Sequence, residues 1–212
     1  MAQRMVLLGG AHSGKSNLAH DICAPLENVC WWGTGVELPQ DGDWQQRLGA
    51  LRAARPASWK TYEGPWAWPV SGVREPQGAQ VFVMDSLNLW LAAQINRCTA
   101  LYSMSQLKTH LEIEFQQLLS ALQAIDCPVV VVSAEVGCGV VPTGEAGRLF
   151  RDLLGVWNCA LVAGAHHGVS LQAGRAFYWP AGLLELPSEG VPLRAVDTGF
   201  LRRLLGLNQL HK

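Results

Sequence analysis

A glycine-rich stretch near the amino terminus has the residue types that bind the phosphates of a nucleotide. It reads Gly9-Gly10-Ala11-His12-Ser13-Gly14-Lys15-Ser16 and fits the pattern G-x-x-x-x-G-K-[ST]. In this pattern the glycines let successive backbone N–H groups point at phosphate oxygens, and the following helix adds its positive amino-terminal end. Lys15 is expected to reach the β- and γ-phosphates, and the Ser16 hydroxyl to bind Mg²⁺. The stretch therefore predicts a site for ATP or GTP together with Mg²⁺.

A second candidate is the acid that ends the apolar run Val81–Asp85. Kinases and hydrolases that use nucleotides carry an acid at the carboxyl end of a strand, where it holds Mg²⁺ or a water bound to the ion. Asp85 is therefore a candidate catalytic and metal-binding residue, together with Lys15 and Ser16. It could also cap the helix expected from Leu87, and the two roles are compatible.

Short apolar runs alternate with helical patterns along the chain. Strands are expected at 5–8, 29–32, 59–62, 81–85, 128–133 and 169–173, and helices at 15–24, 43–54, 87–96, 107–125, 145–166 and 198–207. The four consecutive valines at 129–132 are typical of a central parallel strand. The alternation predicts an α/β fold with helices on both faces of a parallel sheet. Because ligands bind beyond the carboxyl ends of such strands, the glycine-rich stretch, Thr34, Asp85 and Glu135 are expected at one edge.

The composition predicts a compact protein and excludes two classes. Hydrophobic residues make up 49% of the 212 residues, and the formal net charge is −1. Such a chain can bury a core, which argues against intrinsic disorder, and without a basic run it is not expected to bind nucleic acid. No apolar stretch forms a secretory signal or approaches the ~20 residues of a membrane span. We expect a cytoplasmic protein.

Two further segments resemble a known family when they are taken with the glycine-rich stretch. They are Arg55-Pro56-Ala57-Ser58-Trp59 and the string EVGCGVVP at 135–142. In order and spacing, over about residues 4–175, the three segments resemble the adenosylcobinamide kinase/adenosylcobinamide-phosphate guanylyltransferase family of cobalamin assembly. The resemblance implies a P-loop NTPase of RecA-like fold that assembles as a homotrimer. Residues 1–179 would form the nucleotide-binding kinase domain, and 180–212 a C-terminal extension with a terminal helix.

The resemblance implies two reactions on a corrinoid. In the first, the γ-phosphoryl group of ATP or GTP passes to the aminopropanol hydroxyl of adenosylcobinamide. In the second, GMP from GTP is attached to that phosphate through a guanylylated histidine. The resemblance also implies two further groups of nucleotide-binding residues besides the P-loop (residues 9–16) and Asp85. These are Thr34, Gly35 and Val36 after the second strand, and Arg52, Ala53, Ala54, Arg55 and Glu63 on the guanosine side.

The chain departs from the family pattern at the nucleophile. The position of the family's histidine, shortly before the proline of the Arg-Pro-Ala-x-Trp segment, is Leu51 here, and its neighbour Ala50 offers no substitute. Guanylyl transfer through a phosphoramidate needs an imidazole nitrogen. We therefore expect that the kinase step is retained and that GMP transfer is lost or severely impaired.

Alternatives to this reading belong to other functional classes. The chain could be a non-catalytic nucleotide-binding regulator or partner derived from the family, or a P-loop kinase of another small alcohol. Glu135 could act as a base near the acceptor hydroxyl or have a purely structural role. In the leading hypothesis the ligands are a nucleoside triphosphate and a corrinoid.

Overall fold

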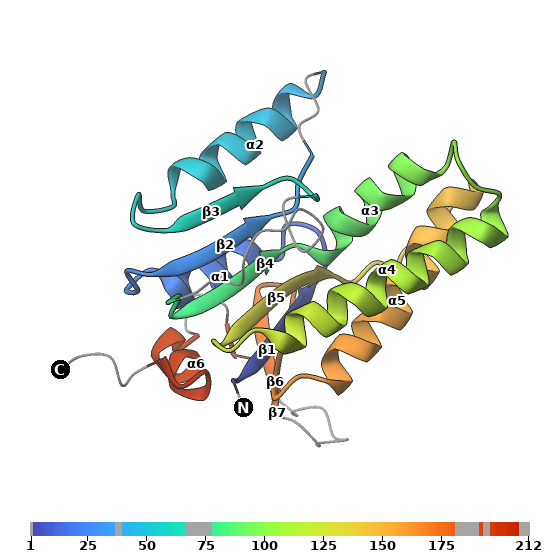
Figure 1. The fold of residues 1–212 in the computed structure, drawn as a ribbon. Coiled ribbons are helices and arrows are strands. Elements are labelled where there is room, and N and C mark those ends of the chain that lie inside the picture. The colour runs from blue at the N-terminus through green and yellow to red at the C-terminus, as the bar shows by residue number, and fades with distance from the viewer. Residues whose placement is uncertain (1, 37–39, 67–77, 181–190, 193–195, 208–212) are drawn as a thin grey trace.

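The structure is a computed structural model that describes the chain except residues 1, 37–39, 67–77, 181–190, 193–195 and 208–212 (Figure 1). The prolines and glycines of the segment 64–78 predict an irregular stretch, and part of this segment lies outside the described residues. The elements in chain order are β1 (Arg4–Gly9), α1 (Lys15–Cys23), β2 (Val29–Gly33), α2 (Gly42–Ala53), β3 (Lys60–Glu63), β4 (Val81–Asp85), α3 (Leu87–Cys98), α4 (Met104–Ala124), β5 (Val129–Ala134), α5 (Glu145–Ala163), β6 (His167–Gln172), β7 (Arg175–Pro180), β8 (Val191–Pro192) and α6 (Thr198–Leu204).

The described strands form one sheet in the order β3-β2-β4-β5-β1-β6-β7-β8. All neighbours from β3 to β6 run parallel, and β7 and β8 add antiparallel pairs at one edge. The valine strand β5 lies between β1, which leads into the P-loop, and β4, which ends at Asp85. This is the RecA-like P-loop architecture that the sequence predicts, and it brings the carboxyl ends of β1 and β4 to the same edge.

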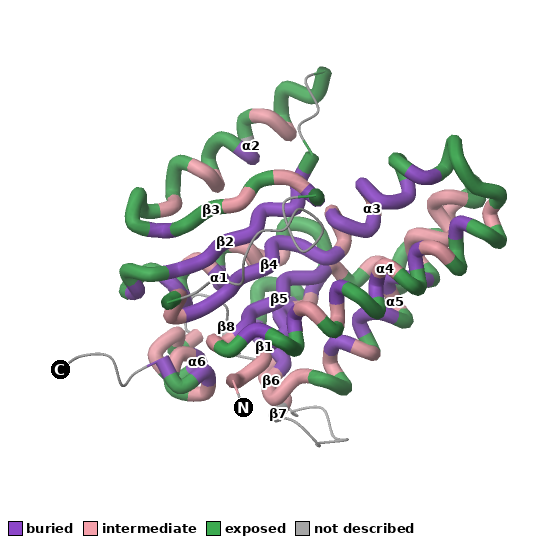
Figure 2. The backbone as a smooth tube through the Cα atoms, in the orientation of Figure 1, coloured by how far each residue is buried: buried purple, intermediate pink, exposed green. Residues whose placement is uncertain are grey.

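Helices cover both faces of the sheet, as expected. Alternate strand residues point to opposite faces, so each face builds its own core. One core joins α3, α4 and α5 to the sheet residues Val6, Cys30, Trp32, Phe82, Met84, Val129 and Val131. The other joins α1 and α6 to Met5, Leu7, Val29, Trp31, Val81, Val83, Val130, Val132, Val169 and Leu171. Figure 2 shows the buried residues concentrated in the strands between these layers, whereas α2 is mostly exposed. None of the described helices is long and apolar enough to cross a membrane.

Three helix boundaries differ from the sequence prediction by three residues, namely the start of α4, the end of α5 and the end of α6, which lies at Leu204 and not at Leu207. Helix α4 begins at Met104, three residues before the expected start, because Ser103 and Gln106 form a capping box that satisfies the first turn. Helix α5 ends at Ala163 and not at His166. His166 is drawn toward the sheet, where its Nδ1 accepts a hydrogen bond of 3.1 Å from the backbone N–H of Arg4.

The terminal helix packs on its own chain. Leu201, Leu205 and Leu207 are buried in the same core as α1. The Arg202 guanidinium donates to the backbone carbonyls of Asp21, at 3.3 Å, and Ile22, at 3.5 Å, in the last turn of α1. A cation near the last carbonyls of a helix is favourable because those groups lack partners within the helix.

A histidine at the start of β6 makes the stability of the fold depend on pH. His167 Nδ1 lies 2.9 Å from the Tyr178 hydroxyl of β7. Burial, and after it the neighbouring His166, lower the pKa of His167 below its ordinary value. In the unfolded chain a histidine has a pKa of about 6.5. Below that pH the unfolded state therefore binds more protons than the folded state. The free energy of unfolding therefore falls as the pH decreases through this range.

Replacing His167 with glutamine removes this titration. We expect the free energy of unfolding of His167→Gln to change less between about pH 7 and pH 5 than that of the wild type. Urea unfolding followed by circular dichroism at several pH values measures both profiles. Identical profiles for the wild type and His167→Gln would contradict this assignment.

Candidate functional site

The P-loop connects β1 to α1 with the geometry that phosphate binding requires. Gly14 has φ 92°, a left-handed conformation that glycine adopts without steric cost, and it directly precedes the first residue of α1. His12 is also left-handed, with φ 56°. The Lys15 ammonium lies over the loop and donates to the Gly10 carbonyl at 2.7 Å and to Ser13 Oγ at 3.4 Å. The Lys15 ammonium and the amino-terminal end of α1 therefore both face the space above the P-loop.

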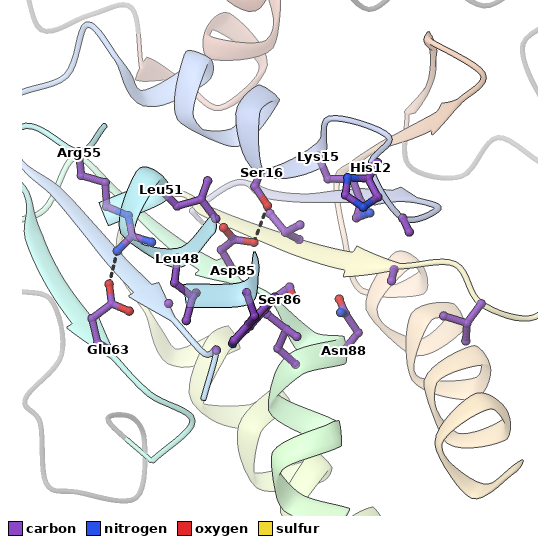
Figure 3. Close-up of a pocket in the computed structure, with 18 residues that line it drawn as sticks. His12, Lys15, Ser16, Leu48, Leu51, Arg55, Glu63, Asp85, Ser86 and Asn88 are labelled. Atoms are coloured by element: carbon purple, nitrogen blue, oxygen red, sulfur yellow. Dashed lines mark hydrogen bonds and ion pairs between the residues drawn. The ribbon is translucent and has the colours of Figure 1, made fainter. Parts of the chain in front are cut away.

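Ser16 and Asp85 meet at the carboxyl edge of the sheet, as the sequence predicts. Ser16 Oγ donates a hydrogen bond of 3.0 Å to Asp85 Oδ1 (Figure 3). Asp85 is only 8% exposed. The cap of α3 is Ser86 and not Asp85, so the Asp85 carboxylate is directed to the P-loop and not to the helix backbone.

Thr34 is bonded to the backbone of the segment that carries Asp85. Its side chain is fully buried; its Oγ1 donates to the Ser86 carbonyl at 2.6 Å and accepts from the Ser86 N–H at 2.8 Å. Its backbone N–H donates to the Asp85 carbonyl at 2.9 Å. The residue that the resemblance assigns to a nucleotide-contacting loop therefore fixes the backbone of Asp85 and Ser86.

Replacing Thr34 with valine tests this support. The change leaves the buried Ser86 N–H without its acceptor, which costs about 1–3 kcal/mol of the free energy of unfolding. Thr34→Ser retains the hydroxyl and is the matched control. Urea unfolding of both variants measures the difference. If Thr34→Val were as stable as Thr34→Ser, the two hydrogen bonds would contribute nothing.

A cavity of about 280 Å³ opens between the P-loop, the end of β4 and helix α2. The predicted residues that line it are Ala11, His12, Lys15, Ser16, Gly35, Arg55, Glu63 and Asp85. Leu51 lines it as well, so the position that lacks the histidine faces the same space as Lys15 and Ser16. Residues that the sequence analysis did not single out complete the lining, namely Gly33, Trp44, Leu48, Ser86, Asn88, Leu89, Val132, Ala134 and Val136.

Helix α2 forms an apolar wall of this cavity. Trp44, Leu48 and Leu51 follow one another at spacings of four and three residues, so they share one face of the helix. Asp41 caps the helix by accepting from the Trp44 N–H at 2.9 Å, and the Trp44 indole N–H donates to the Val36 carbonyl at 2.8 Å. The helical spacing is a signal in the sequence that the three residues share an apolar face, but it does not show that this face lines a cavity.

An arginine and a glutamate lie at one end of the cavity. Arg55 forms an ion pair with Glu63, and its guanidinium lies 5.0 Å from the centre of the Trp31 ring (Figure 3). Arg52 approaches the same carboxylate, with Nε 3.5 Å from Glu63 Oε2. Two cations and a carboxylate supply donors and acceptors suited to the polar edge of a nucleobase or to a sugar.

Other residues assigned by the resemblance lie outside the cavity lining. Ala53 and Ala54 are exposed, and the Ala54 carbonyl lies 2.9 Å from His20 Nε2. Val36 is 40% exposed and contributes its carbonyl to Trp44. Glu135 follows β5, and its Oε1 accepts from the Gly137 N–H at 2.7 Å. This contact fits the structural role that the sequence analysis left open for Glu135.

The oxygen atoms of Ser16 and Asp85 suit a small hard cation such as Mg²⁺. A hydroxyl and a carboxylate oxygen, already 3.0 Å apart, are the ligand types that Mg²⁺ prefers. Over the described part of the chain no group of three or more His, Cys, Asp or Glu side chains is placed to hold a metal. An ion at this site would therefore take its remaining ligands from phosphates and water, which is how Mg²⁺ is usually bound in nucleotide sites.

The comparisons with known proteins agree with the geometry of the site. Residues 5–178 match the family model described as "Cobinamide kinase / cobinamide phosphate guanyltransferase". The chain is similar to the bifunctional adenosylcobalamin biosynthesis protein CobP of Pseudomonas aeruginosa, with 31% identity over 190 residues, covering 90% of this chain and 99% of that protein. It is also similar to CobU, another bifunctional adenosylcobalamin biosynthesis protein, from Salmonella typhimurium, with 28% identity covering 76% and 91% of the two chains.

A solved structure, the KaiC-like protein PH0186 from Pyrococcus horikoshii OT3, aligns with a TM-score of 0.35 and 13% identity, over 89% of this chain and 83% of that one. The family model spans most of the chain, and the P. aeruginosa relative is matched over nearly its whole length. The resemblance drawn from the three sequence segments is thereby confirmed. The chain belongs to the cobinamide kinase / cobinamide phosphate guanyltransferase family of cobalamin biosynthesis.

Proposed function

We propose that the protein is a Mg²⁺-dependent kinase that transfers the γ-phosphoryl group of ATP or GTP to the aminopropanol hydroxyl of adenosylcobinamide. The observation that carries the proposal is the juxtaposition of Lys15, Ser16 and Asp85 around one cavity in a member of this family. The P-loop and these three side chains are the parts that phosphoryl transfer needs from a protein.

In the transfer, the hydroxyl oxygen of the acceptor forms a bond to the γ-phosphorus as the bond to the β,γ-bridging oxygen breaks. The nucleoside diphosphate leaves with the electron pair of that bond, and the hydroxyl proton passes to water. Negative charge develops on the bridging and γ-phosphoryl oxygens, so Lys15 and the backbone N–H groups of the P-loop stabilise the transition state more than the ground state. Catalysis then rests on position and electrostatics, with no covalent intermediate on the protein.

Ser16 and Asp85 would hold the Mg²⁺, which neutralises charge on the β- and γ-phosphates when bound. Asp85 is kept in place by its backbone contacts with Thr34 and by its side-chain contact with Ser16. The protein thus sets the position of the carboxylate before a nucleotide arrives.

We further propose that GMP transfer is lost or severely impaired in this chain. Leu51 lines the cavity and has no lone pair that could form a bond to phosphorus. Ala50 is exposed and borders an adjoining hollow that includes His12 and Trp44. If the protein catalyses only the first step, a separate nucleotidyl transferase would use its phosphorylated product as substrate.

The family resemblance also leads us to propose a homotrimer that binds a nucleotide and a corrinoid. Light scattering coupled to size-exclusion chromatography measures the mass of the assembly against the 23.0 kDa of one chain. A monomeric mass at working concentrations would contradict this part of the proposal.

Nucleotide consumption with and without adenosylcobinamide tests the proposed activity. We expect release of nucleoside diphosphate to depend on the acceptor and on Mg²⁺, and mass spectrometry to detect adenosylcobinamide phosphate. Binding of nucleotide without consumption would instead favour a nucleotide-binding regulator. Consumption with a different alcohol from an acceptor panel, and none with the corrinoid, would favour a kinase of another substrate.

A further inference from the structure

One polar side chain of the cavity has a hydrogen-bonding atom that the protein does not satisfy. Asn88 lies in the first turn of α3, three residues after Asp85, and lines the cavity. Its Oδ1 is buried, and none of the residues that the structure describes donates a hydrogen bond to it. Because a buried acceptor without a donor is unfavourable, such an atom in a binding cavity points to a ligand that supplies the donor.

The backbone that carries Asn88 is held firmly on both sides. The Ser86 N–H and carbonyl are both bonded to the Thr34 hydroxyl, and the Trp90 N–H donates to the Ser86 carbonyl at 3.1 Å. Leu87 and Trp90, on either side of Asn88 in the chain, are 0% and 1% exposed. The Asn88 amide therefore has a fixed point of attachment, and only rotation of the side chain remains. A half-turn of the amide exchanges its oxygen and nitrogen, so either atom can face the cavity.

Asn88 is separated from the polar end of the cavity at Arg55 and Glu63. Figure 3 shows it on the side of Asp85 away from that ion pair, with His12 and Lys15 of the P-loop across the cavity from it. Its neighbours in the lining of the same cavity include the apolar residues Leu89, Ala134 and Val136. If the nucleotide is held between the P-loop and the Arg55–Glu63 pair, Asn88 lies beyond the phosphates, on the side from which an acceptor enters.

The chemistry of a carboxamide suits this position. It is neutral, so it adds no charge beside the carboxylate of Asp85, and it offers one oxygen acceptor and two N–H donors. The oxygen can accept from a hydroxyl group, and the N–H can donate to a phosphoryl oxygen. A group with both capacities can align an alcohol with the phosphorus that it attacks.

We propose that Asn88 orients the hydroxyl group of the acceptor alcohol, through a hydrogen bond from that hydroxyl to Oδ1, in line with the γ-phosphoryl group. The inference rests on the proposed phosphoryl transfer and assigns one further residue to it. Asn88 then determines how well the acceptor reacts and contributes little to the binding of the nucleotide.

Asn88→Leu keeps the approximate size of the side chain and removes its hydrogen bonds. We expect kcat/KM for adenosylcobinamide to fall by about 10- to 100-fold, because misplacement of a reacting group has effects of this size. The Kd for ATP or GTP, measured by calorimetry with Mg²⁺, should stay within about twofold, since the nucleotide contacts are elsewhere. The unfolding temperature should stay the same or rise, because the variant no longer buries an unpaired acceptor.

Two further variants separate orientation from a structural role. Asn88→Ser retains a small acceptor and should recover part of the lost activity. Asn96→Ala changes the same residue type at an exposed position of α3 and should behave as the wild type. Loss of activity together with unchanged or higher stability is a combination that a merely structural residue does not produce.

The outcomes distinguish this inference from the proposed function. A wild-type rate in Asn88→Leu would overturn the inference while leaving the kinase proposal in place. A large rise in the Kd for nucleotide in that variant would also overturn it, because the amide would then hold the nucleotide. Failure of the wild type itself to phosphorylate adenosylcobinamide would be seen in the control arm, and it would remove the proposed function and with it this inference.

Discussion

Replacing Lys15 with alanine is expected to lower the rate of phosphoryl transfer by about 10³-fold or more. The ammonium group of Lys15 lies over the P-loop, bonded to the Gly10 carbonyl at 2.7 Å, and faces the cavity shared by Ser16 and Asp85. It is the only lysine among the described residues that line this cavity. Without it, the negative charge that develops on the transferring group loses its nearest fixed cation, while the backbone N–H groups of the P-loop remain.

The measurement is the rate of nucleoside diphosphate release in the presence of adenosylcobinamide and Mg²⁺. Lys108→Ala is a suitable control because Lys108 lies on α4 and pairs with Glu112 at 3.9 Å, one turn along the same helix. Its activity should equal that of the wild type. Circular dichroism of both variants checks that they are folded. A Lys15→Ala variant that is folded and turns over at the wild-type rate would contradict the role given to the P-loop.

The sequence predicts the phosphate side of the site because the information there is local. The P-loop needs a strand, a turn with specific glycines and a helix within a few residues of each other, and all three can be recognised without knowing the rest of the fold. The position of Asp85 beside the P-loop is predicted by one further inference. The acid ends an apolar run, and the carboxyl ends of parallel strands share one edge of the sheet. The 3.0 Å contact between Ser16 and Asp85 confirms that inference.

The opposite wall of the cavity could not be predicted in the same way. Trp44, Leu48 and Leu51 have the spacing of an ordinary amphipathic helix, and nothing local says that their apolar face lines a cavity and not the protein core. Asn88 is one of several polar residues of α3, and its unpaired oxygen is visible only once the surrounding packing is known. Thr34 likewise follows a strand end, and the bonds of its hydroxyl to the backbone of Ser86, 52 residues away, are visible only in the folded chain.

Tertiary contacts also explain where the predicted elements were inaccurate. Helical periodicity continues to His166 in the sequence, yet α5 ends at Ala163 because the chain must enter β6 beside β1. The pairing of His166 with the backbone of Arg4 joins residues 162 positions apart. No window of the sequence contains both partners, so periodicity alone cannot place the end of the helix.

The wild-type protein is expected to take up no covalent guanylyl label from GTP. In guanylylation an imidazole nitrogen forms a bond to the α-phosphorus of GTP, and pyrophosphate leaves with the electron pair of the broken P–O bond. The product is a phosphoramidate, which is labile in acid and stable in base. Leu51, which faces the cavity, and the neighbouring Ala50 have no atom that can form this bond.

The positions of the other histidines support this expectation. His20 contacts the Ala54 carbonyl, His110 pairs with Glu114, and His167 contacts the Tyr178 hydroxyl. His166 accepts from the backbone of Arg4. Among the described histidines only His12 lines the cavity, and it lies within the P-loop and not on α2.

Incubation with α-³²P-GTP and Mg²⁺, followed by electrophoresis, measures the label, and a family member that has the histidine serves as the positive control. Leu51→His and Ala50→His place an imidazole on the inner and outer sides of α2, and we expect label in one of them, with Leu51→Gln as the negative control of similar size. Base-stable label on the wild type would contradict the loss of GMP transfer. In that case His12→Gln tests the nucleophile: disappearance of the label would assign the reaction to the P-loop histidine, and its persistence would assign it to another nitrogen, such as the amine of Lys15 in the same cavity or a histidine outside it. Either result would mean that α2 does not supply the nucleophile of the covalent step in this chain, whereas an unlabelled wild type agrees with the proposed loss of GMP transfer.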